Sequence, residues 1–360
     1  MRKLASIRRI AELHPITNRD RIELAIVDGW SVIVKKGEYK VGDATIFIET
    51  DSIVPSNAPY FEFLAKAKFR IKTMKMAGVV SQGLCAPLSL LNQNTSYCSG
   101  TDVTEELGII QWDNAISESE QGSTNDERAK KYPKWLMRHK WFRKLVLPKK
   151  KDKGFPAYIT KSDENRIQNL PYLLKDKTVL WTVREKLDGQ SATYVLKRRK
   201  RFLLQDKFEF IVCSRNMRRG REDNSSFWQV ARKYGIKKKL RDRIGEYDFV
   251  CVQGEIIGPK IQGNKYGLGD YEFYVFNTST NMNKDDGARH PDEDCLFLGL
   301  VWCPIITTIY TMPDTVSEVL EFATGKSLLA NVLREGVVLR NSKGASTKAV
   351  SPKFLLKHDE

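Results

Sequence analysis

Histidine and paired cysteine are scarce in this sequence. Its 360 residues include four histidines, and the six cysteines are scattered with no Cys-x-x-Cys pair. A zinc knuckle needs ligands at close spacing, and disulfide frameworks belong to small secreted chains. A histidine-based metal site or triad is therefore poorly supported. The GxxxxGK[ST] phosphate loop, the GxSxG elbow and the HExxH helix are also missing, so the usual signals of three large enzyme classes are absent.

Long apolar runs are missing as well. No stretch approaches the roughly 18 consecutive apolar residues that a membrane span needs. The N-terminal Met-Arg-Lys-Leu leads at once into charged sequence, without the core of a signal peptide. We therefore expect an intracellular, cytoplasmic protein with no membrane partner. Its length and its hydrophobic content of 41% allow two or three domains with real cores.

Positive charge is abundant. Lys and Arg number 60 against 44 Asp and Glu, which gives a formal net charge of +16. Basic surfaces concentrate phosphates and release counterions when they bind nucleic acid. Simple solubility would explain the same excess, so composition favours a polyanionic partner without identifying it.

Residues 1–92 contain short β-branched runs separated by turn residues. Runs at 21–27 and 30–34 are split by an Asp-Gly pair, which is a hairpin signal, and a third run follows at 44–48. Short strands at this spacing predict a small β-barrel.

The segment 69–75 alternates bulky apolar and basic residues. On a single strand, this alternation puts Arg70, Lys72 and Lys75 near one face. That face is either solvated or a surface for phosphate contact.

Residues 93–153 have the composition of a linker. The first part is polar, whereas residues 129–153 hold eleven Lys/Arg and one acidic residue, with Trp135, Trp141 and Phe142 interleaved. Basic groups with stacking aromatics suit single-stranded or nicked RNA. An amphipathic helix whose aromatics dock on a neighbouring domain explains the pattern equally well.

Residues 154–360 mix strand-like runs with two helical stretches. Helices are predicted near 225–244 and 315–331. The strand-like runs lie at 178–183, 192–196, 249–252, 271–276 and 336–340. This is a mixed α+β pattern with largely antiparallel sheets.

The strand-like run at 178–183 leads into Glu-Lys-Leu-Asp-Gly at 185–189. Alone, a KxDG segment is most often a surface hairpin. Five further segments follow in order: Cys-Ser-Arg-Asn at 213–216, Gly-Glu-Ile-Ile-Gly at 254–258, Tyr-Val-Phe-Asn at 274–277, Glu-Gly-Val-Val-Leu-Arg at 335–340 and Thr-Lys-Ala-Val at 347–350. Six segments coinciding in order are strong evidence for one site.

This ordered set resembles the covalent nucleotidyltransferase superfamily of DNA ligases, RNA ligases and mRNA capping enzymes, and within it the nick-sealing RNA ligases. Segments at 35–43, 81–84 and 160–170 resemble RNA ligases that carry an OB-type barrel before the catalytic domain. The resemblance implies an α+β protein in three parts. These are an OB-like β-barrel at 1–92, the linker at 93–153, and at 154–360 a nucleotidyltransferase domain of ATP-grasp-like antiparallel sheets with helices.

Within that resemblance, Lys186 is the expected catalytic nucleophile. A lysine amine that attacks the α-phosphorus of ATP gives a phosphoramidate, which can later pass AMP to another phosphate. Because a free lysine has a pKa of about 10.4, nearby cations must depress the pKa of Lys186. Mg²⁺ or Mn²⁺ near the α-phosphate, with Arg215 and Lys348, would do so and would offset charge on the departing pyrophosphate.

The same resemblance implies a nucleotide-binding set. Glu185 belongs to it, and Arg215 would lie near the ribose and phosphate or contact the RNA end. Phe276 would stack on adenine, Lys348 would grip the α-phosphate, and Glu255 would hold the ribose hydroxyls. Each also has an ordinary explanation, as a surface arginine, a core aromatic, a strand lysine or a turn carboxylate.

The expected metal set consists of Asp188, Glu255 and Glu335. Glu335, which is also in the nucleotide-binding set, would orient Mg²⁺ through water together with Asp188. Mg²⁺ typically keeps several waters and uses few carboxylates, so this number of ligands is reasonable.

The resemblance is imperfect near the C-terminus. Related enzymes often have a second lysine two residues after the first in the last motif, where this chain has Val350, so Lys348 acts alone or with Lys353. No C-terminal OB domain of the DNA-ligase or capping-enzyme type is expected, and the N-terminal barrel must then orient pyrophosphate. Candidates for contacts to pyrophosphate, nucleotide or RNA are Arg70, Lys72, Lys75 and Arg166.

The expected activity is that of a monomeric, ATP-dependent RNA ligase for RNA repair, which joins 3′-hydroxyl and 5′-phosphate RNA ends at nicks. A DNA ligase or a GTP-using capping enzyme would share the chemistry. A non-catalytic RNA-binding protein, working through its barrel and basic linker, is a third reading. The intact Lys186, Glu255, Glu335 and Lys348 argue against that third reading.

Overall fold

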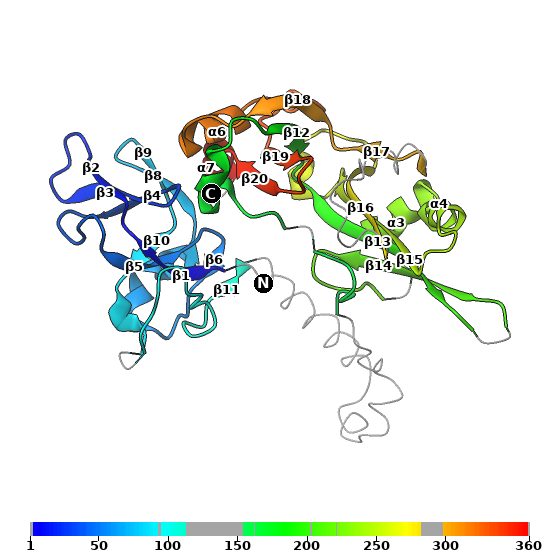
Figure 1. Ribbon diagram of the computed structural model, residues 1–360, viewed down its shortest axis with the longest axis horizontal. Helices are drawn as coiled ribbons and strands as arrows, with labels where there is room; N and C mark the ends of the chain where they lie inside the picture. The colour runs from blue at the N-terminus through cyan, green and yellow to red at the C-terminus, as the bar shows by residue number, and fades with distance from the viewer. Residues whose placement is uncertain are drawn as a thin grey trace, which may run out of the picture. The chain divides into compact units, whose positions relative to one another are not determined.

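The computed structural model describes residues 3–92, 95–112, 154–161, 163–201, 204–220, 222–281 and 298–358. It divides into two compact units (Figure 1). Unit 1 comprises Met1–Lys151 with Leu355–Glu360, and unit 2 comprises Asp152–Phe354. The basic aromatic segment predicted at 129–153 lies outside the described residues. The domain limits at residues 92 and 153 stay predictions.

Unit 1 is built from short strands in small sheets. The first sheet joins β1 (Ala5–Arg9), β5 (Ala44–Ile48) and β10 (Leu84–Ala86), and the second joins β2 (Glu12–Pro15), β3 (Ile22–Val27) and β4 (Trp30–Lys35). The remaining strands are β6 (Ser52–Ile53), β7 (Arg70–Ile71) and β11 (Ile110–Gln111), which pair together, and the hairpin β8 (Thr73–Met76) with β9 (Val79–Gln82). Two 3₁₀ helices complete the unit, η1 (Pro59–Ala67) and η2 (Leu88–Leu90).

The predicted hairpin between 21–27 and 30–34 is present. Val27 pairs with Trp30 across a two-residue turn, and Asp28 in that turn has a φ of 51°. Asp followed by Gly suits such a turn because both tolerate the left-handed region. Trp30 and Phe47 pack at the centre of one hydrophobic cluster of the unit.

The single strand expected over 69–75 is wrong. The chain changes partners at Lys72: β7 pairs with β6, whereas β8 pairs with β9. Arg70 and Lys75 therefore belong to two different sheets, and the alternation along the sequence does not place them on one strand face.

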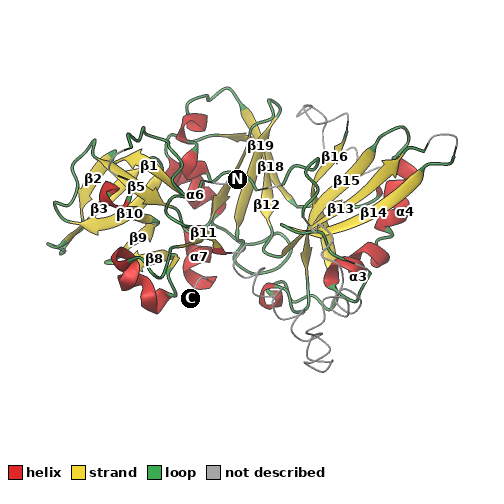
Figure 2. Ribbon diagram, turned by 90° about the horizontal axis from the view of Figure 1, so that it is seen from below, coloured by secondary structure: helices red, strands yellow, loops and turns green. Residues whose placement is uncertain are grey.

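Unit 2 contains two sheets (Figure 2). A five-stranded sheet has the order β14-β13-β15-β16-β17, and a four-stranded sheet has the order β18-β12-β19-β20. Pairing is antiparallel except between β16 and β17, which agrees with the predicted antiparallel pattern. The strands are β12 (Leu180–Lys186), β13 (Gln190–Arg199), β14 (Lys207–Ser214), β15 (Phe249–Ile257), β16 (Glu272–Thr280), β17 (Val301–Trp302), β18 (Ile305–Thr311), β19 (Gly336–Asn341) and β20 (Ser346–Val350).

The helices of this region are shorter than the sequence predicts. The stretch expected near 225–244 forms two helices, α3 (Ser226–Lys233) and α4 (Ile236–Arg243), because Gly235 between them has a φ of 59°. The stretch expected at 315–331 forms only α6 (Val316–Ala323). The other helices are η4 (Ile167–Asn169), η5 (Pro171–Leu174), η6 (Gln262–Asn264) and α7 (Pro352–His358).

At the C-terminal end of α6, the last backbone carbonyls accept hydrogen bonds from the side chain of Arg334. Arg334 donates to the carbonyl of Ala323 at 2.9 Å and to that of Phe322 at 2.5 Å. These are carbonyls that a longer helix would bond internally. Thr315 and Glu318 form a capping box at the other end.

The two faces of the five-stranded sheet have different roles. On the helix face, Tyr194, Leu196 and Val252 pack in one cluster with α3 and α4 (Figure 2). The opposite face carries the alternate residues of each strand, including Val195 and Glu255. We call this opposite face the site face. No helix in the described part of the chain is long and apolar enough to cross a membrane.

Candidate active site

Lys186 is the last residue of β12. Trp181 and Val183 on the same strand point into the hydrophobic core, so the period of two directs Lys186 to the other side of the four-stranded sheet. Its Nζ donates a hydrogen bond to Glu335 Oε2 at 2.6 Å. The two side chains are 23% and 16% exposed, so this ion pair is largely shielded from water. Glu335 directly precedes β19, whose Gly336 pairs with Lys186 in the sheet.

The electrostatic surroundings of Lys186 keep it protonated. Burial lowers the pKa of the amine, but the carboxylates of Glu335 and Glu255 raise it more strongly, and the nearby Arg215 opposes them only in part. The net pKa lies above the ordinary lysine value. The side chains alone therefore do not supply the depressed pKa that nucleophilic attack requires.

Two carboxyl groups near Lys186 hold their protons more tightly than usual. Burial raises the pKa of Glu255 to about 8, although Lys186 and Arg215 both act to lower it. Burial also raises the pKa of Glu335, against the opposing effect of Lys186. Glu255 lies on β15 and Glu335 precedes β19, so the site joins the two sheets of unit 2.

Lys348 and Arg215 share a carboxylate that was given no role in the sequence analysis. Lys348 Nζ lies 2.6 Å from Asp163 Oδ1, and Arg215 Nη2 lies 3.8 Å from the same oxygen. Lys348 also donates its backbone N–H to the carbonyl of Asn165. An anion therefore already occupies the place between two cations that were expected to hold phosphate.

Asp188 is likewise engaged by residues that the motifs did not single out. Its carboxylate forms an ion pair with Lys265, and its backbone N–H donates to the Tyr266 hydroxyl at 3.0 Å. Lys265 and Tyr266 directly follow η6. They follow Ile-Gln-Gly-Asn at 261–264, and none of the six motif segments includes them.

Glu185 is 1% exposed. Its Oε2 accepts a hydrogen bond from the backbone N–H of Leu328 at 2.7 Å, while its Oε1 is buried without a hydrogen-bond partner. A buried acceptor of this kind is costly unless a donor reaches it. Glu185 therefore offers a free hydrogen-bonding position inside the site.

Phe276 is half-buried in a cluster with Leu187, Ile257 and Leu329. Its carbonyl accepts a hydrogen bond from Arg340 Nη1 at 2.5 Å. Because Arg340 lies on β19 of the other sheet, this bond ties the two sheets together beside the ring.

Arg166 is 3% exposed and its backbone lies beside that of Lys348. It belongs to the interior that supports β20, not to the exposed surface. Arg70, Lys72 and Lys75 belong to unit 1. Arg70 pairs with Asp51 at 3.3 Å and lies 4.7 Å from the centre of the Trp112 ring, whereas Lys75 is exposed.

The expected metal set is not assembled as a cluster. Among the described residues, no three carboxylate, histidine or cysteine side chains are grouped closely enough to hold a metal ion. Glu335 is occupied by Lys186 and Asp188 by Lys265. The assignment of Asp188, Glu255 and Glu335 as metal residues therefore stays a prediction.

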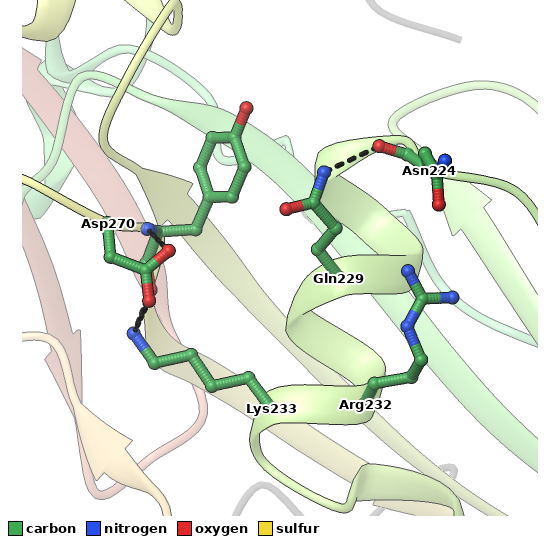
Figure 3. A pocket seen from close by; sticks show the side chains of 6 residues that line it. Asn224, Gln229, Arg232, Lys233 and Asp270 are labelled. Carbon is green, nitrogen blue, oxygen red and sulfur yellow. Dashed lines mark hydrogen bonds and ion pairs between the residues drawn. The ribbon is translucent and has the colours of Figure 1, made fainter.

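A separate hollow of about 590 Å³ lies on the α3 side of the unit (Figure 3). Asp270 and Tyr271, Asn224, and three residues of α3 line it. Figure 3 shows Lys233 reaching Asp270 and Gln229 reaching the backbone of Asn224. Lys233 pairs with Asp270 and Arg232 pairs with Glu222, and none of the sequence-predicted site residues lines the hollow.

Comparison with family models gives two matches. Residues 179–357 match the RNA ligase family, and residues 4–88 match an OB-fold domain. None of the curated proteins matches the chain.

Solved structures of one RNA ligase match the chain over its whole length. An apo mutant of Naegleria gruberi RNA ligase is 30% identical, with a TM-score of 0.78, and the match covers 100% of this chain and 99% of that one. The same ligase with PPi is 30% identical, with a TM-score of 0.76 and the same coverage. A mutant with ATP and Mn is 29% identical, with a TM-score of 0.75 and 99% coverage of both chains. The expected α+β fold, an OB-type domain followed by a sheet-rich nucleotidyltransferase domain, is confirmed.

Proposed function

Because the chain belongs to the RNA ligase family, we propose that it is an ATP-dependent RNA ligase that seals 3′-hydroxyl and 5′-phosphate ends at nicks, through a lysyl-AMP on Lys186. The observation that carries the proposal is the surroundings of this lysine. Its amine is shielded from water, bonded to Glu335, and close enough to Glu255 and Arg215 to respond to their charges. A surface hairpin lysine would have none of these neighbours.

The proposed nucleotide is ATP, used with Mg²⁺ or Mn²⁺. Matching ligase structures hold ATP and Mn, and AMP and Mn. When bound, a divalent cation would screen the phosphates and the nearby carboxylates, which removes the influence that raises the pKa of Lys186. Asp188, Glu255 and Glu335 are the proposed residues for it, directly or through water.

The site has three features that fit a nucleotide. The unpartnered Oε1 of Glu185 is a buried acceptor suited to the exocyclic amine of adenine. Phe276 presents a half-buried ring on which a base can stack. Lys348 and Arg215 would exchange Asp163 for phosphate oxygens.

In the first proposed step, the Lys186 amine bonds to the α-phosphorus of ATP and pyrophosphate leaves. Before it attacks, the amine must lose a proton. Glu335 Oε2 already accepts its hydrogen bond at 2.6 Å, and burial makes this carboxylate more basic than usual. Glu335 is therefore the proposed first acceptor of that proton.

Two steps complete the proposed cycle. AMP passes from Lys186 to an RNA 5′-phosphate, which forms a 5′–5′ pyrophosphate linkage. The 3′-hydroxyl of the other end then attacks the RNA phosphorus and releases AMP. Alignment of the ends and stabilisation of the phosphates contribute most to such transfers.

The test is covalent labelling followed by a ligation panel. Incubation with ATP labelled at the α-phosphate, and with Mg²⁺, should label the wild-type protein and leave Lys186→Ala unlabelled. The panel compares nicked RNA with nicked DNA, replacing one strand at a time, and compares ATP with GTP. A wild type that takes no label refutes the enzyme, and preferential sealing of DNA, or labelling by GTP alone, refutes the assigned substrate.

A further inference from the structure

The site face of the β13–β14 hairpin carries a run of positive charge of which the proposed adenylylation chemistry uses only Arg215, at one end. Val195 and Ile211 mark this face, because they pack against Phe155 and Tyr158 on the side away from α3 and α4. The next pairs in register on the same side are Lys197 with Glu209 and Arg199 with Lys207. The hairpin track, as we call it, consists of Lys161, Lys197, Arg199, Lys207, Arg215 and Arg218.

The cations of the track outnumber the carboxylates that pair with them. Glu209 pairs with both Arg199 and Arg218 at 2.5 Å, and Asp163 lies near Arg215 at 3.8 Å. Glu209 and Asp163 thus serve three of the six cations, namely Arg199, Arg218 and Arg215. Lys207 is exposed and makes no ion pair within the described ranges, and Arg199 is 63% exposed. An uncompensated run of cations along one strand pair attracts a polyanion.

The aromatic rings under the track are already covered. Lys197 Nζ lies 4.4 Å from the centre of the Tyr158 ring, which also packs 5.1 Å from Phe249. Lys161 Nζ lies 5.7 Å from the centre of the Phe155 ring. Because lysines cover the rings, these rings are not open platforms for bases. The track therefore suits contacts with phosphates, not with bases.

The track also has a direction and a length. Its exposed cations lie at the far end of β13, a strand that runs from Gln190, directly after the Lys186 motif, to Arg199. Ten strand residues, joined by nine steps, span roughly 30 Å. At roughly 3.4 Å per nucleotide along one strand, this distance corresponds to about nine nucleotides.

We propose that the hairpin track binds the phosphate backbone of RNA flanking the break, out to about nine nucleotides from the ends that are joined. The inference rests on the proposed function, and it assigns a binding surface to the RNA on one side of the break. Recognition by phosphate alone makes this contact independent of sequence and strongly dependent on salt.

The test compares two pairs of exposed cations on opposite faces of one sheet. Arg199→Ala/Lys207→Ala removes two charges from the track. Lys237→Ala/Lys238→Ala removes two exposed charges from α4 on the helix face and serves as the matched control. Binding of nicked RNA is measured by fluorescence anisotropy without ATP or divalent metal, with the two flanks lengthened separately from four to sixteen base pairs.

The expected result depends on flank length. The track variant should bind about 5- to 10-fold more weakly than wild type when one particular flank exceeds roughly nine base pairs, and equally well when that flank is short. The slope of log affinity against log salt should fall by about 1 to 2. The control variant should bind like wild type.

Three outcomes would overturn the inference. They are an equal loss in both double variants, a loss that does not depend on flank length, and no loss on either flank. Lys207→Glu and Lys207→Arg give a second test, because the arginine should keep the affinity and the glutamate should lose it. Labelling of the wild type by ATP is measured without RNA and tests the proposed function. RNA binding is measured without ATP and tests the hairpin track, so the two proposals can fail independently.

Discussion

Charged side chains cluster at both ends of β13, but they are paired with opposite charges at one end and mostly exposed at the other. At the end that we propose to be catalytic, three cations each pair with a carboxylate: Lys186 with Glu335, Lys265 with Asp188, and Lys348 with Asp163. At the far end, Arg199 and Lys207 are exposed and outnumber their partners.

This difference separates two uses of charge. Pairs shielded from water are strong and specific, so removing one partner has a large effect. Exposed cations gain little from their neighbours and act mainly through long-range attraction. The shielded end therefore suits the proposed chemistry, and the exposed end suits weak, long-range attraction of a polyanion.

The largest effect should come from the nucleophile. Lys186→Ala should reduce labelling by ATP at least about 1,000-fold, because no other amine is held at that position. Lys186→Arg keeps a cation beside Glu335 but cannot form the adduct, and it should be equally inactive while melting close to wild type. Labelling and thermal melting are measured on both. An active arginine variant would place the nucleophile elsewhere.

A second effect concerns Glu255 and stability. The folded state holds the Glu255 proton up to about pH 8, whereas the unfolded chain releases it near 4.5. The folded state thus binds more protons between these values, and stability falls as pH rises through this window. Glu255→Gln should lack this slope and gain about 2 kcal/mol over wild type by pH 8, after discounting for partial exposure. Denaturant titrations of both proteins at pH 5 and pH 8 check this. A difference in free energy of unfolding between variant and wild type that is the same at both pH values would contradict it.

A smaller effect is expected when Asp163 loses its charge. Asp163→Asn should lower the KM for ATP about 5-fold, because an anion no longer competes with phosphate for Lys348 and Arg215. Asp206→Asn, which removes a carboxylate paired with Arg198 near the far end, is the matched control and should leave the KM unchanged. A raised KM for Asp163→Asn would mean that Asp163 positions the two cations.

The smallest expected effect comes from the same contrast between paired and exposed cations in unit 1. Arg70 is paired with Asp51 and covers Trp112, so Arg70→Ala should cost about 1 kcal/mol of stability. The exposed Lys75→Ala should change stability by less than about 0.5 kcal/mol. Melting temperatures test this difference, and equal losses would refute it. Labelling rates of the same proteins test the proposed contact of both residues with pyrophosphate.

The sequence motifs predicted which residues lie together in the site, but they did not predict the ion-pair partners of those residues. Lys186 and Glu335 come together because β12 pairs with β19, a pairing that short apolar runs can anticipate, whereas Glu255 reaches them from β15 of the other sheet. Asp163 and Lys265 were missed because an ion-pair partner is chosen by the folded chain and leaves no periodic signal. The early end of α6 has the same cause, since Arg334 acts from beyond the helix.

The pairing of β12 with β19 has a consequence for motion within the site. Because Lys186 lies opposite Gly336, the proposed nucleophile and its proposed proton acceptor, Glu335, are held by one pair of strands, although they are 149 positions apart in the chain. Glu255 and Phe276 are carried by the other sheet, joined to β12 by the short turn before β13. A slide between the sheets would therefore move Glu255 and Phe276 relative to the amine and would stretch the bond from Arg340 to the Phe276 carbonyl, while the pairing of β12 with β19 stays intact.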